Sequence, residues 1–538
     1  MNNILPSPLK VTTSDSARMP TDKGLSIVTD NEELRSVVTA LFASLDIEIN
    51  DDSPVKLVLS GDDAPSEIGC DESYTLIIRD NVADVKATTR SGLLYGAVSF
   101  AELYFAHFSN NKSTIPAAEI EDRPKYAYRG YMLDVSRHFF PIKYLYKTVD
   151  ALLLHKINVF HIHLTDDQGW RIEIKKYPKL TEIGSKRAET TGDKTPHGGF
   201  YTQDEMKDLV KYAMERGVTI VPEIDLPGHF TSALASYPEL GCTGATVPVE
   251  TDFGVKRTIL CGGKDGSYRF LTDVFGELIE LFPAPYYHIG GDEAFRVNWK
   301  SCPHCLAKAD ELKLDNIYEL QTYITNYVVD FLKQHGKRAI VWNETMNGDN
   351  VDDSVICQYW SDGNKAPTVT YEMNRGRTVI NSHTAPFYLD YPYGRNSLKA
   401  IYNADMKLSG APRAEFFGVE APLWTEWVAT EARADYMAFP RVAALAEVGW
   451  SENRDYYAFL RNLDLLYNVY TKLNIKAAPL SVVNPGFFAG KLEIARFYPK
   501  NFLRTRKKRE AVNDGRLFMQ EMKELREIYR KKREARKD

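Results

Sequence analysis

Short apolar runs alternate with amphipathic helical patterns along most of the chain, from about residue 124 to about residue 450. Apolar runs of about four to eight residues between polar segments are typical of strands that are buried on both faces of a parallel sheet. Eight such strands are predicted, at 128–135, 159–164, 218–224, 286–289, 338–342, 355–359, 378–381 and 418–423.

Helical patterns separate several of these strands, most clearly at 203–216 and 316–334, and a last helix is predicted at 439–448. A helix between two strands lets the chain return and add the next strand in parallel. Eight strands connected in this way predict an α/β fold, a (β/α)8 TIM barrel.

The first 120 residues or so follow a different pattern, with helices predicted at 32–45 and 93–105 and strands at 55–59 and 74–78. The polar segment 109–123, with Pro116 and the adjacent Pro124, is predicted to be a linker. Beyond about residue 453 the pattern is helical. We therefore predict a small N-terminal α+β domain at 1–122, a (β/α)8 catalytic domain at 123–455 and a helical C-terminal extension with a basic tail at 456–538.

The composition is that of a globular protein, with 44% hydrophobic and 26% charged residues among 538. A net charge of −6 argues against nucleic-acid binding by the chain as a whole, because phosphate recognition requires clustered positive charge. Residues 501–538 differ, since they hold 14 Lys and Arg against 7 Asp and Glu, a charge of +7. They predict a solvated helical tail or, as the alternative, a tail that binds a polyanion.

No apolar run is long enough to span a bilayer, and the N-terminus lacks the apolar segment of a secretory signal. We expect a periplasmic or secreted protein whose leader is absent from this chain, or otherwise a cytoplasmic one. Cys302 and Cys305 have a spacing that suits a metal or redox site, but no second such pair follows. Loop residues or one local disulfide are therefore favoured over zinc, and no metal or cofactor is expected.

Polar and aromatic residues gather where the predicted strands end, which is where barrel enzymes place their active sites. These strand ends include Arg137, Asp166, His229, Asp292, Glu293, Trp342, Trp360, Trp424 and Glu426. Carboxylates and arginine bind sugar hydroxyls, while indole rings cover the apolar faces of a pyranose. The combination indicates a carbohydrate ligand. Two adjacent acids after Gly290 and Gly291 can push their pKa values apart, which leaves one protonated as a general acid.

Two stretches resemble a known family. Residues 161–171 read HIHLTDDQGWR and residues 288–293 read HIGGDE. Over about residues 4–453 the chain resembles the β-N-acetylhexosaminidases of glycoside hydrolase family 20, for which both stretches are highly specific. The resemblance implies a retaining, exo-acting enzyme that removes terminal β-linked GlcNAc or GalNAc from oligosaccharides or glycoconjugates without a cofactor. Neither the sequence nor the resemblance predicts the oligomeric state of the protein.

The resemblance also assigns roles. Glu293 would protonate the glycosidic oxygen and later deprotonate water. Asp292 would hold the acetamido N–H of the substrate so that the acetamido oxygen attacks C1 and forms an oxazolinium-like intermediate. This family is an exception to the usual two-carboxylate scheme of glycosidases. Asp166 and His229 would position and tune Glu293, and Tyr388 would donate a hydrogen bond to the acetamido carbonyl.

Substrate-binding roles follow from the same resemblance. Trp342, Trp360 and Trp424 would form the wall of the −1 subsite, which holds the sugar that is released. The hydroxyls of that sugar would be bound by Arg137, Asp390 and Glu426. Many relatives carry an aromatic residue of the +1 subsite near residues 402–404, and the sequence Tyr-Asn-Ala departs from that pattern. The preference for the leaving group is therefore open.

Two rival functions remain to be weighed. A sugar-binding protein that has lost catalysis would keep the aromatic residues, but it would not need a protonated acid such as Glu293. A barrel metallohydrolase would use the spacing of His161 and His163, two residues whose side chains point to the same side of a strand. Among later strand ends only His229 and His383 could add histidine ligands.

Overall fold

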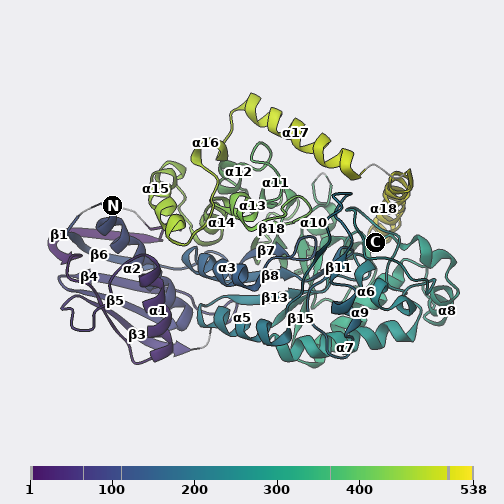
Figure 1. The fold of residues 1–538 in the computed structure, drawn as a ribbon, viewed down its shortest axis with the longest axis horizontal. Helices are drawn as coiled ribbons and strands as arrows, with labels where there is room; N and C mark the ends of the chain where they lie inside the picture. Colours follow the sequence, from purple (N-terminus) through teal and green to yellow (C-terminus); the bar gives the residue numbers. More distant parts are fainter. Residues whose placement is uncertain (1–3, 65, 111, 364, 506–508, 536–538) are drawn as a thin grey trace.

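The protein is described by a computed structural model that covers residues 4–64, 66–110, 112–363, 365–505 and 509–535 (Figure 1). Parallel strands form a closed barrel in the order β13-β14-β15-β16-β17-β18-β7-β8. Their bounds are β7 (Tyr128–Asp134), β8 (Val159–His163), β13 (Thr219–Glu223), β14 (Tyr286–His288), β15 (Arg338–Trp342), β16 (Ile356–Tyr359), β17 (Val379–Asn381) and β18 (Gly418–Leu423).

The eight predicted strands and the TIM barrel are confirmed. Every residue of β7, β8 and β18 is buried, which explains why these strands appear as continuous apolar runs without alternation. The predicted helices are also present, as α5 (Gln203–Glu215), α9 (Glu319–Gln334) and α14 (Arg441–Trp450). A capping box at Thr202 and Glu205 fixes the start of α5, as its sequence favours.

A six-stranded sheet precedes the barrel, with strand order β1-β6-β4-β5-β3-β2 (Figure 1, left). Its strands are β1 (Lys10–Pro20), β2 (Ser26–Val28), β3 (Lys56–Ala64), β4 (Tyr74–Arg79), β5 (Val82–Thr89) and β6 (Thr114–Asp122). The same domain contains helices α1 (Glu32–Ser44) and α2 (Arg90–Ser109). Helix α2 contacts strands β3, β4, β5 and β6 of the sheet. The predicted α+β domain is therefore present.

The prediction of a linker at 109–123 is wrong, because most of this segment is strand β6, paired with both β1 and β4. Pro116 is tolerated since it lies opposite Arg18, where the register of β1 shifts, and pairing with β4 begins only at Ala118. Asp122 at the end of β6 is buried against Lys156 of the barrel domain, with Oδ2 3.1 Å from Nζ. The domain limits themselves stay predictions.

The C-terminal extension is helical, as predicted, with α15 (Tyr456–Lys472), α16 (Leu480–Val483), α17 (Phe487–Thr505) and α18 (Arg509–Ala535). The prediction of a solvated tail is wrong for one face of α18, where Phe518, Met522, Leu525 and Tyr529 are buried in a cluster with Phe295 and Tyr318. Residues 506–508 and 536–538 of the predicted tail lie outside the described residues. Within the described residues, no helix has the length and apolar composition that crossing a membrane requires.

Candidate active site

The predicted site residues come together at the carboxyl ends of the barrel strands. Arg137 follows β7, Asp166 follows β8, and His229 follows β13. Asp292 and Glu293 follow β14 in the loop formed by residues 290–293, which we call the acid loop. The three tryptophans lie at the ends of β15, β16 and β18. Each of the strands named here therefore contributes a site residue to the same edge of the barrel.

The acid loop needs glycine at two successive positions. Gly290 and Gly291 have φ of 63° and 102°, in the left-handed region that glycine adopts without strain. A Cβ on Gly290 would lie 1.7 Å from Oδ1 of Asp225, and one on Gly291 would lie 2.0 Å from Oγ1 of Thr345. The two glycines therefore let the loop pass close against its neighbours and turn Asp292 and Glu293 toward the site.

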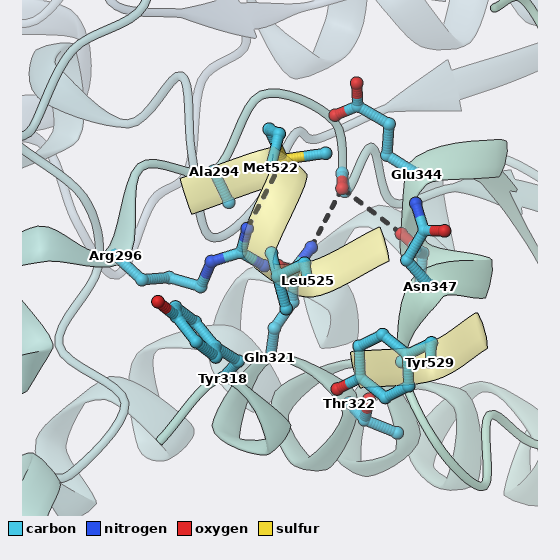
Figure 2. A pocket seen from close by; sticks show the side chains of 13 residues that line it. Ala294, Arg296, Tyr318, Gln321, Thr322, Glu344, Asn347, Met522, Leu525 and Tyr529 are labelled. Atoms are coloured by element: carbon cyan, nitrogen blue, oxygen red, sulfur yellow. Dashed lines mark hydrogen bonds between the residues drawn. The ribbon is translucent and has the colours of Figure 1, made fainter. Parts of the chain in front are cut away.

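Hydrogen bonds from side chains of neighbouring elements fix the backbone of the acid loop. The Gly291 N–H donates to Oδ1 of Asp225 at 3.0 Å. The Gly291 carbonyl accepts from Nε2 of Gln321 at 2.8 Å and from Oγ1 of Thr345 at 3.3 Å, as the dashed lines in Figure 2 show. The Glu293 N–H donates to Oε2 of Glu344 at 2.6 Å. The backbone of both acids is thus fixed by groups from several strand ends and from α9.

The two acids differ in exposure. The side chain of Asp292 is 12% exposed, and that of Glu293 is 31% exposed. Oδ1 of Asp292 is buried. Nε2 of His229 lies 3.7 Å from Oδ2 of Asp292 and 3.6 Å from Oε2 of Glu293. One imidazole therefore contacts both acids, and the Asp292 side chain also has a hydrogen bond from the Asp225 carboxyl group.

A buried charged network continues from His229 into the barrel. Nδ1 of His229 is 3.1 Å from Oδ1 of Asp166, whose Oδ2 is 2.7 Å from Nη2 of Arg137 and 2.9 Å from Nε2 of His163. Burial raises the pKa of Asp166, but Arg137 and His229 outweigh burial and bring this pKa well below its usual range. Burial lowers the pKa of His229, but the charge of Asp166 raises it well above its ordinary value. His229 is therefore an imidazolium beside the two acids.

The acids around the loop have raised pKa values. Burial, reinforced by the charge of Glu293, raises the pKa of Asp292 to about 6 although His229 opposes the shift. Burial and the charge of Asp292 raise the pKa of Asp225 well above its usual range. Burial and the charge of Glu293 raise the pKa of Glu344 to about 8. At neutral pH Asp225 and Glu344 are thus mainly neutral, and Asp292 carries most of the charge of the three.

The aromatic residues form a cluster with Tyr388. Trp360 stacks on Tyr388 with ring centroids 6.3 Å apart, and Trp424 lies 5.8 Å from Trp342 and 6.3 Å from Tyr388. Nε1 of Trp342 donates to Oε1 of Glu223 at 2.8 Å, which fixes the plane of that indole. The indole N–H of Trp360 is buried and has no partner within the described residues.

Arg137 and two further acids lie beside this cluster. The Arg137 guanidinium lies 4.9 Å above the ring of Trp424 and forms a second ion pair with Asp134 at 3.2 Å. Burial and the charge of Glu426 raise the pKa of Asp390 to about 8, and Oδ1 of Asp390 is buried without a partner among the described residues. Burial also raises the pKa of Glu426, with Arg137 opposing it. These groups present hydroxyl-binding atoms next to an apolar wall.

The histidine pair considered for a metal site is held by carboxylates. Nδ1 of His161 is 3.0 Å from Oε1 of Glu420 and its Nε2 is 3.2 Å from Oε2 of Glu223, which also pairs with His163. His383 is not part of this pair, and its Nδ1 lies 2.7 Å from the carbonyl oxygen of Ala385. His288, at the end of β14, was not among the predicted ligands, and its Nδ1 lies 2.8 Å from Oε1 of Glu223. His161, Glu223 and His288 have ligand atoms within 4.8 Å of one another, so three histidines gather around Glu223 in the barrel interior.

The sequence places Asp225 and Glu344 among the polar residues at the strand ends but assigns neither of them a role in the site. Both follow predicted strands, but a position at a strand end does not tell which acids contact the acid loop. Tyr402 does not reach the site, because its ring packs against Tyr456 and Phe459 of α15 at 5.1 and 4.8 Å.

Comparisons with known proteins identify the family to which the chain belongs. The model of the glycosyl hydrolase family 20 catalytic domain matches residues 126–453, and the model of domain 2 of the same family matches residues 1–123. A β-hexosaminidase of Porphyromonas gingivalis is 35% identical over 86% of this chain, which spans only 62% of that relative. A β-hexosaminidase of Akkermansia muciniphila is 33% identical over 71% of this chain and 79% of its own length.

Solved structures are also similar. The N-acetyl-β-hexosaminidase of Streptomyces plicatus, solved with thio-NAglucal, has a TM-score of 0.75 and 32% identity over 88% of this chain and 96% of its own. A family 20 exo-β-N-acetylglucosaminidase of Vibrio harveyi, solved with N-acetylglucosamine, has a TM-score of 0.77 and 27% identity over 89% of this chain and 78% of its own. With its catalytic-domain match covering more than half of its length, the chain belongs to glycosyl hydrolase family 20.

Proposed function

We propose that the protein is a retaining exo-β-N-acetylhexosaminidase that removes terminal β-linked GlcNAc or GalNAc from oligosaccharides or glycoconjugates. The observation that carries the proposal is the pairing of Asp292 and Glu293 on one imidazolium beside the tryptophan and tyrosine cluster. Known relatives named as β-hexosaminidases, from bacteria to Homo sapiens, support it.

In the proposed reaction Glu293 acts on the leaving group. Its carboxyl protonates the glycosidic oxygen as the C1–O bond breaks, and the resulting carboxylate then takes a proton from the water that attacks C1. His229 and Asp166 are positioning residues, because they act on Glu293 through the imidazolium at 3.6 Å. The imidazolium stabilises the carboxylate form that Glu293 must pass through between the two steps.

Asp292 directs the nucleophile, which belongs to the substrate. Its carboxylate, which His229 and Asp225 hold in place, receives the acetamido N–H and aims the acetamido oxygen at C1, where an oxazolinium intermediate forms as the leaving group departs. The negative charge of Asp292 stabilises the positive charge that develops on this ring, and the Tyr388 hydroxyl donates to the acetamido oxygen.

The remaining residues bind the sugar. Trp342, Trp360 and Trp424 cover the apolar faces of the −1 sugar, and Arg137, Asp390 and Glu426 bind its hydroxyls at the non-reducing end. A terminal sugar enclosed in this way leaves no room for a chain beyond it, which makes the enzyme exo-acting. We propose that GlcNAc and GalNAc are both accepted, because two carboxyl groups and one guanidinium offer hydrogen-bond partners to O4 in either configuration.

Glu293→Gln tests the proposal directly. We expect kcat on chitobiose to fall about 10²- to 10⁴-fold while binding of a thiazoline inhibitor is retained, since amide and carboxyl groups have the same shape. A glycoside with a dinitrophenyl leaving group should lose less in its cleavage step, because it needs little protonation. The matched control is Glu280→Gln, at an exposed position of α7 (Asp265–Leu281), which should leave kcat unchanged.

A wild-type protein that binds the inhibitor but turns over neither substrate would refute the proposal. That result would instead identify a sugar-binding protein on the same fold.

A further inference from the structure

Four cysteines from distant parts of the chain meet in one cluster outside the candidate active site. Cys242 and Cys261 belong to the connection that follows β13, and Cys302 and Cys305 belong to the connection that follows β14. Their four sulfur atoms all lie within 4.8 Å of one another. The Sγ–Sγ distances are 3.8 Å for Cys242–Cys305, 3.8 Å for Cys261–Cys302 and 3.5 Å for Cys261–Cys305.

These distances suit a tetrahedral metal ion. Four thiolates at about 2.3 Å from one zinc ion place their sulfurs about 3.8 Å apart, which is close to the spacing observed. A disulfide needs an S–S bond of about 2.05 Å, and all six cysteines of the chain are free thiols in the structure. An iron–sulfur cube binds each thiolate to a different iron atom, so its ligands lie farther apart than one shared ion requires.

The backbone is shaped to bring the two halves together. Cys302 precedes helix α8 (Pro303–Glu311) and Cys305 lies in its first turn, so both thiols of this C-x2-C pair point from one helix end. The opposite segment approaches this turn at Gly263, where a Cβ would lie 2.1 Å from the backbone of His304. The Cys261 N–H donates to the carbonyl of Leu240 at 2.9 Å, which ties Cys261 to the segment of Cys242.

The cluster is largely enclosed, and one positive charge lies beside it. Cys261, Cys302 and Cys305 are buried and Cys242 is partly buried. Nζ of Lys264 donates to the carbonyls of Glu239 and Gly241, at 2.9 and 2.6 Å, and so places a positive charge beside the segment that carries Cys242. That charge offsets part of the net charge of −2 that one Zn²⁺ and four thiolates would carry.

We propose that Cys242, Cys261, Cys302 and Cys305 bind one Zn²⁺ ion as a structural site. Four protein ligands fill a tetrahedral ion and leave no position for water, so the site has no catalytic role. It would join the connection that carries His229 to the one that carries Asp292 and Glu293. Cys302 is nine residues after Glu293, so the ion would limit the movement of the acid loop.

Metal content tests the site in the full-length protein. Protein purified without chelators should contain about one zinc ion per chain, measured by elemental analysis and native mass spectrometry. Cys302→Ser and Cys305→Ser should each lose most of that zinc and lower the thermal midpoint. The matched controls are Cys357→Ser, at a buried cysteine in β16, and His304→Ala, inside the C-x2-C pair, which should both keep the zinc.

A second measurement does not depend on the folding of a variant. Wild-type protein grown with Co²⁺ in place of Zn²⁺ should show the visible absorption bands of tetrahedral cobalt with four thiolates. An intact mass lower by four hydrogens, which indicates two disulfides, would overturn the proposal. So would iron in place of zinc, or free thiols that bind neither Zn²⁺ nor Co²⁺. None of these outcomes bears on Glu293, so the proposed activity is tested separately.

Discussion

Asp292 and Glu293 are neighbours in the sequence but have different surroundings. Asp292 is almost covered, and burial raises its pKa to about 6, whereas Glu293 is about one third exposed. Asp292 must be ionised to hold the acetamido N–H and to stabilise the oxazolinium charge. A raised pKa means that this carboxylate is lost as the pH falls through about 6.

The pH profile of kcat/KM should therefore have an acidic limb near pH 6. We expect kcat/KM on a nitrophenyl N-acetylglucosaminide to fall about tenfold for each pH unit below that value, since protonated Asp292 cannot act as the acceptor. The measurement is kcat/KM from pH 4 to pH 9, with stability checked at each pH. A profile that stays flat down to pH 4.5 would contradict this role of Asp292.

Glu344 is expected to position Glu293 through the backbone. Glu344→Ala leaves the Glu293 N–H without its acceptor at 2.6 Å, and a small displacement of the acid can lower kcat by about 10²-fold. Glu344→Gln keeps an amide oxygen as acceptor and should restore most of kcat. Both variants should bind a thiazoline inhibitor nearly as the wild type does. Equal losses of kcat in the alanine and glutamine variants would argue against a positioning role.

Residue roles could be predicted from the sequence only where the family resemblance supplied them. The HIGGDE stretch locates Asp292 and Glu293, and the two glycines before them indicate a close backbone approach. Nothing in the sequence indicates that Asp225 contacts Gly291 or that Glu344 contacts Glu293. Those contacts depend on how neighbouring strand ends are staggered around the barrel.

At the scale of elements, α18 is the part whose position the sequence predicts least. Its high charge indicates solvation, yet Glu521 pairs with Arg296, three residues after the acid loop, with Oε1 3.0 Å from Nε and both side chains nearly buried. Arg296, Gln321 and Met522 line the pocket behind Gly291 and Glu344 (Figure 2). The buried face of α18 packs against Phe295 and Tyr318. The sequence of α18 alone does not show this partner surface, so it does not show which face is buried.

Glu521→Ala should destabilise the protein by about 3 to 5 kcal/mol, because Arg296 would remain buried without its partner. Thermal unfolding and kcat are the measurements, and kcat should fall as the segment after Glu293 loosens. Glu527→Ala on the exposed side of α18 is the matched control, with an expected change within about 0.5 kcal/mol. Equal unfolding midpoints for the two variants would show that α18 does not support the acid loop.

Strand β6 is a second element whose structure was not predicted from the sequence. Its proline and acidic residues suggest a linker, but Ile115 and Ile120 are buried and Pro116 sits where β1 shifts register. A strand at such an irregularity tolerates residues that a regular strand would exclude. The pairing partner, which lies about 100 residues away in the sequence, decides the outcome.

At the scale of the whole molecule, the barrel could be predicted because its strands are buried on both faces and helical patterns separate several of them. The same repeating order places all strand ends on one side, so the sequence also locates the active site. The cysteine cluster could not be predicted in this way. Cys242 and Cys261 are 19 residues apart, and only folding brings them to the Cys302–Cys305 pair.

The central claim is that the acetamido group of the substrate attacks its own C1 under the control of Asp292. The most direct measurement compares kcat/KM for nitrophenyl β-N-acetylglucosaminide with that for nitrophenyl β-glucoside, which has a hydroxyl at C2. We expect the glucoside to react at least about 10³-fold more slowly, because it has no group to form the oxazolinium ring. Comparable rates for the two glycosides would contradict the claim.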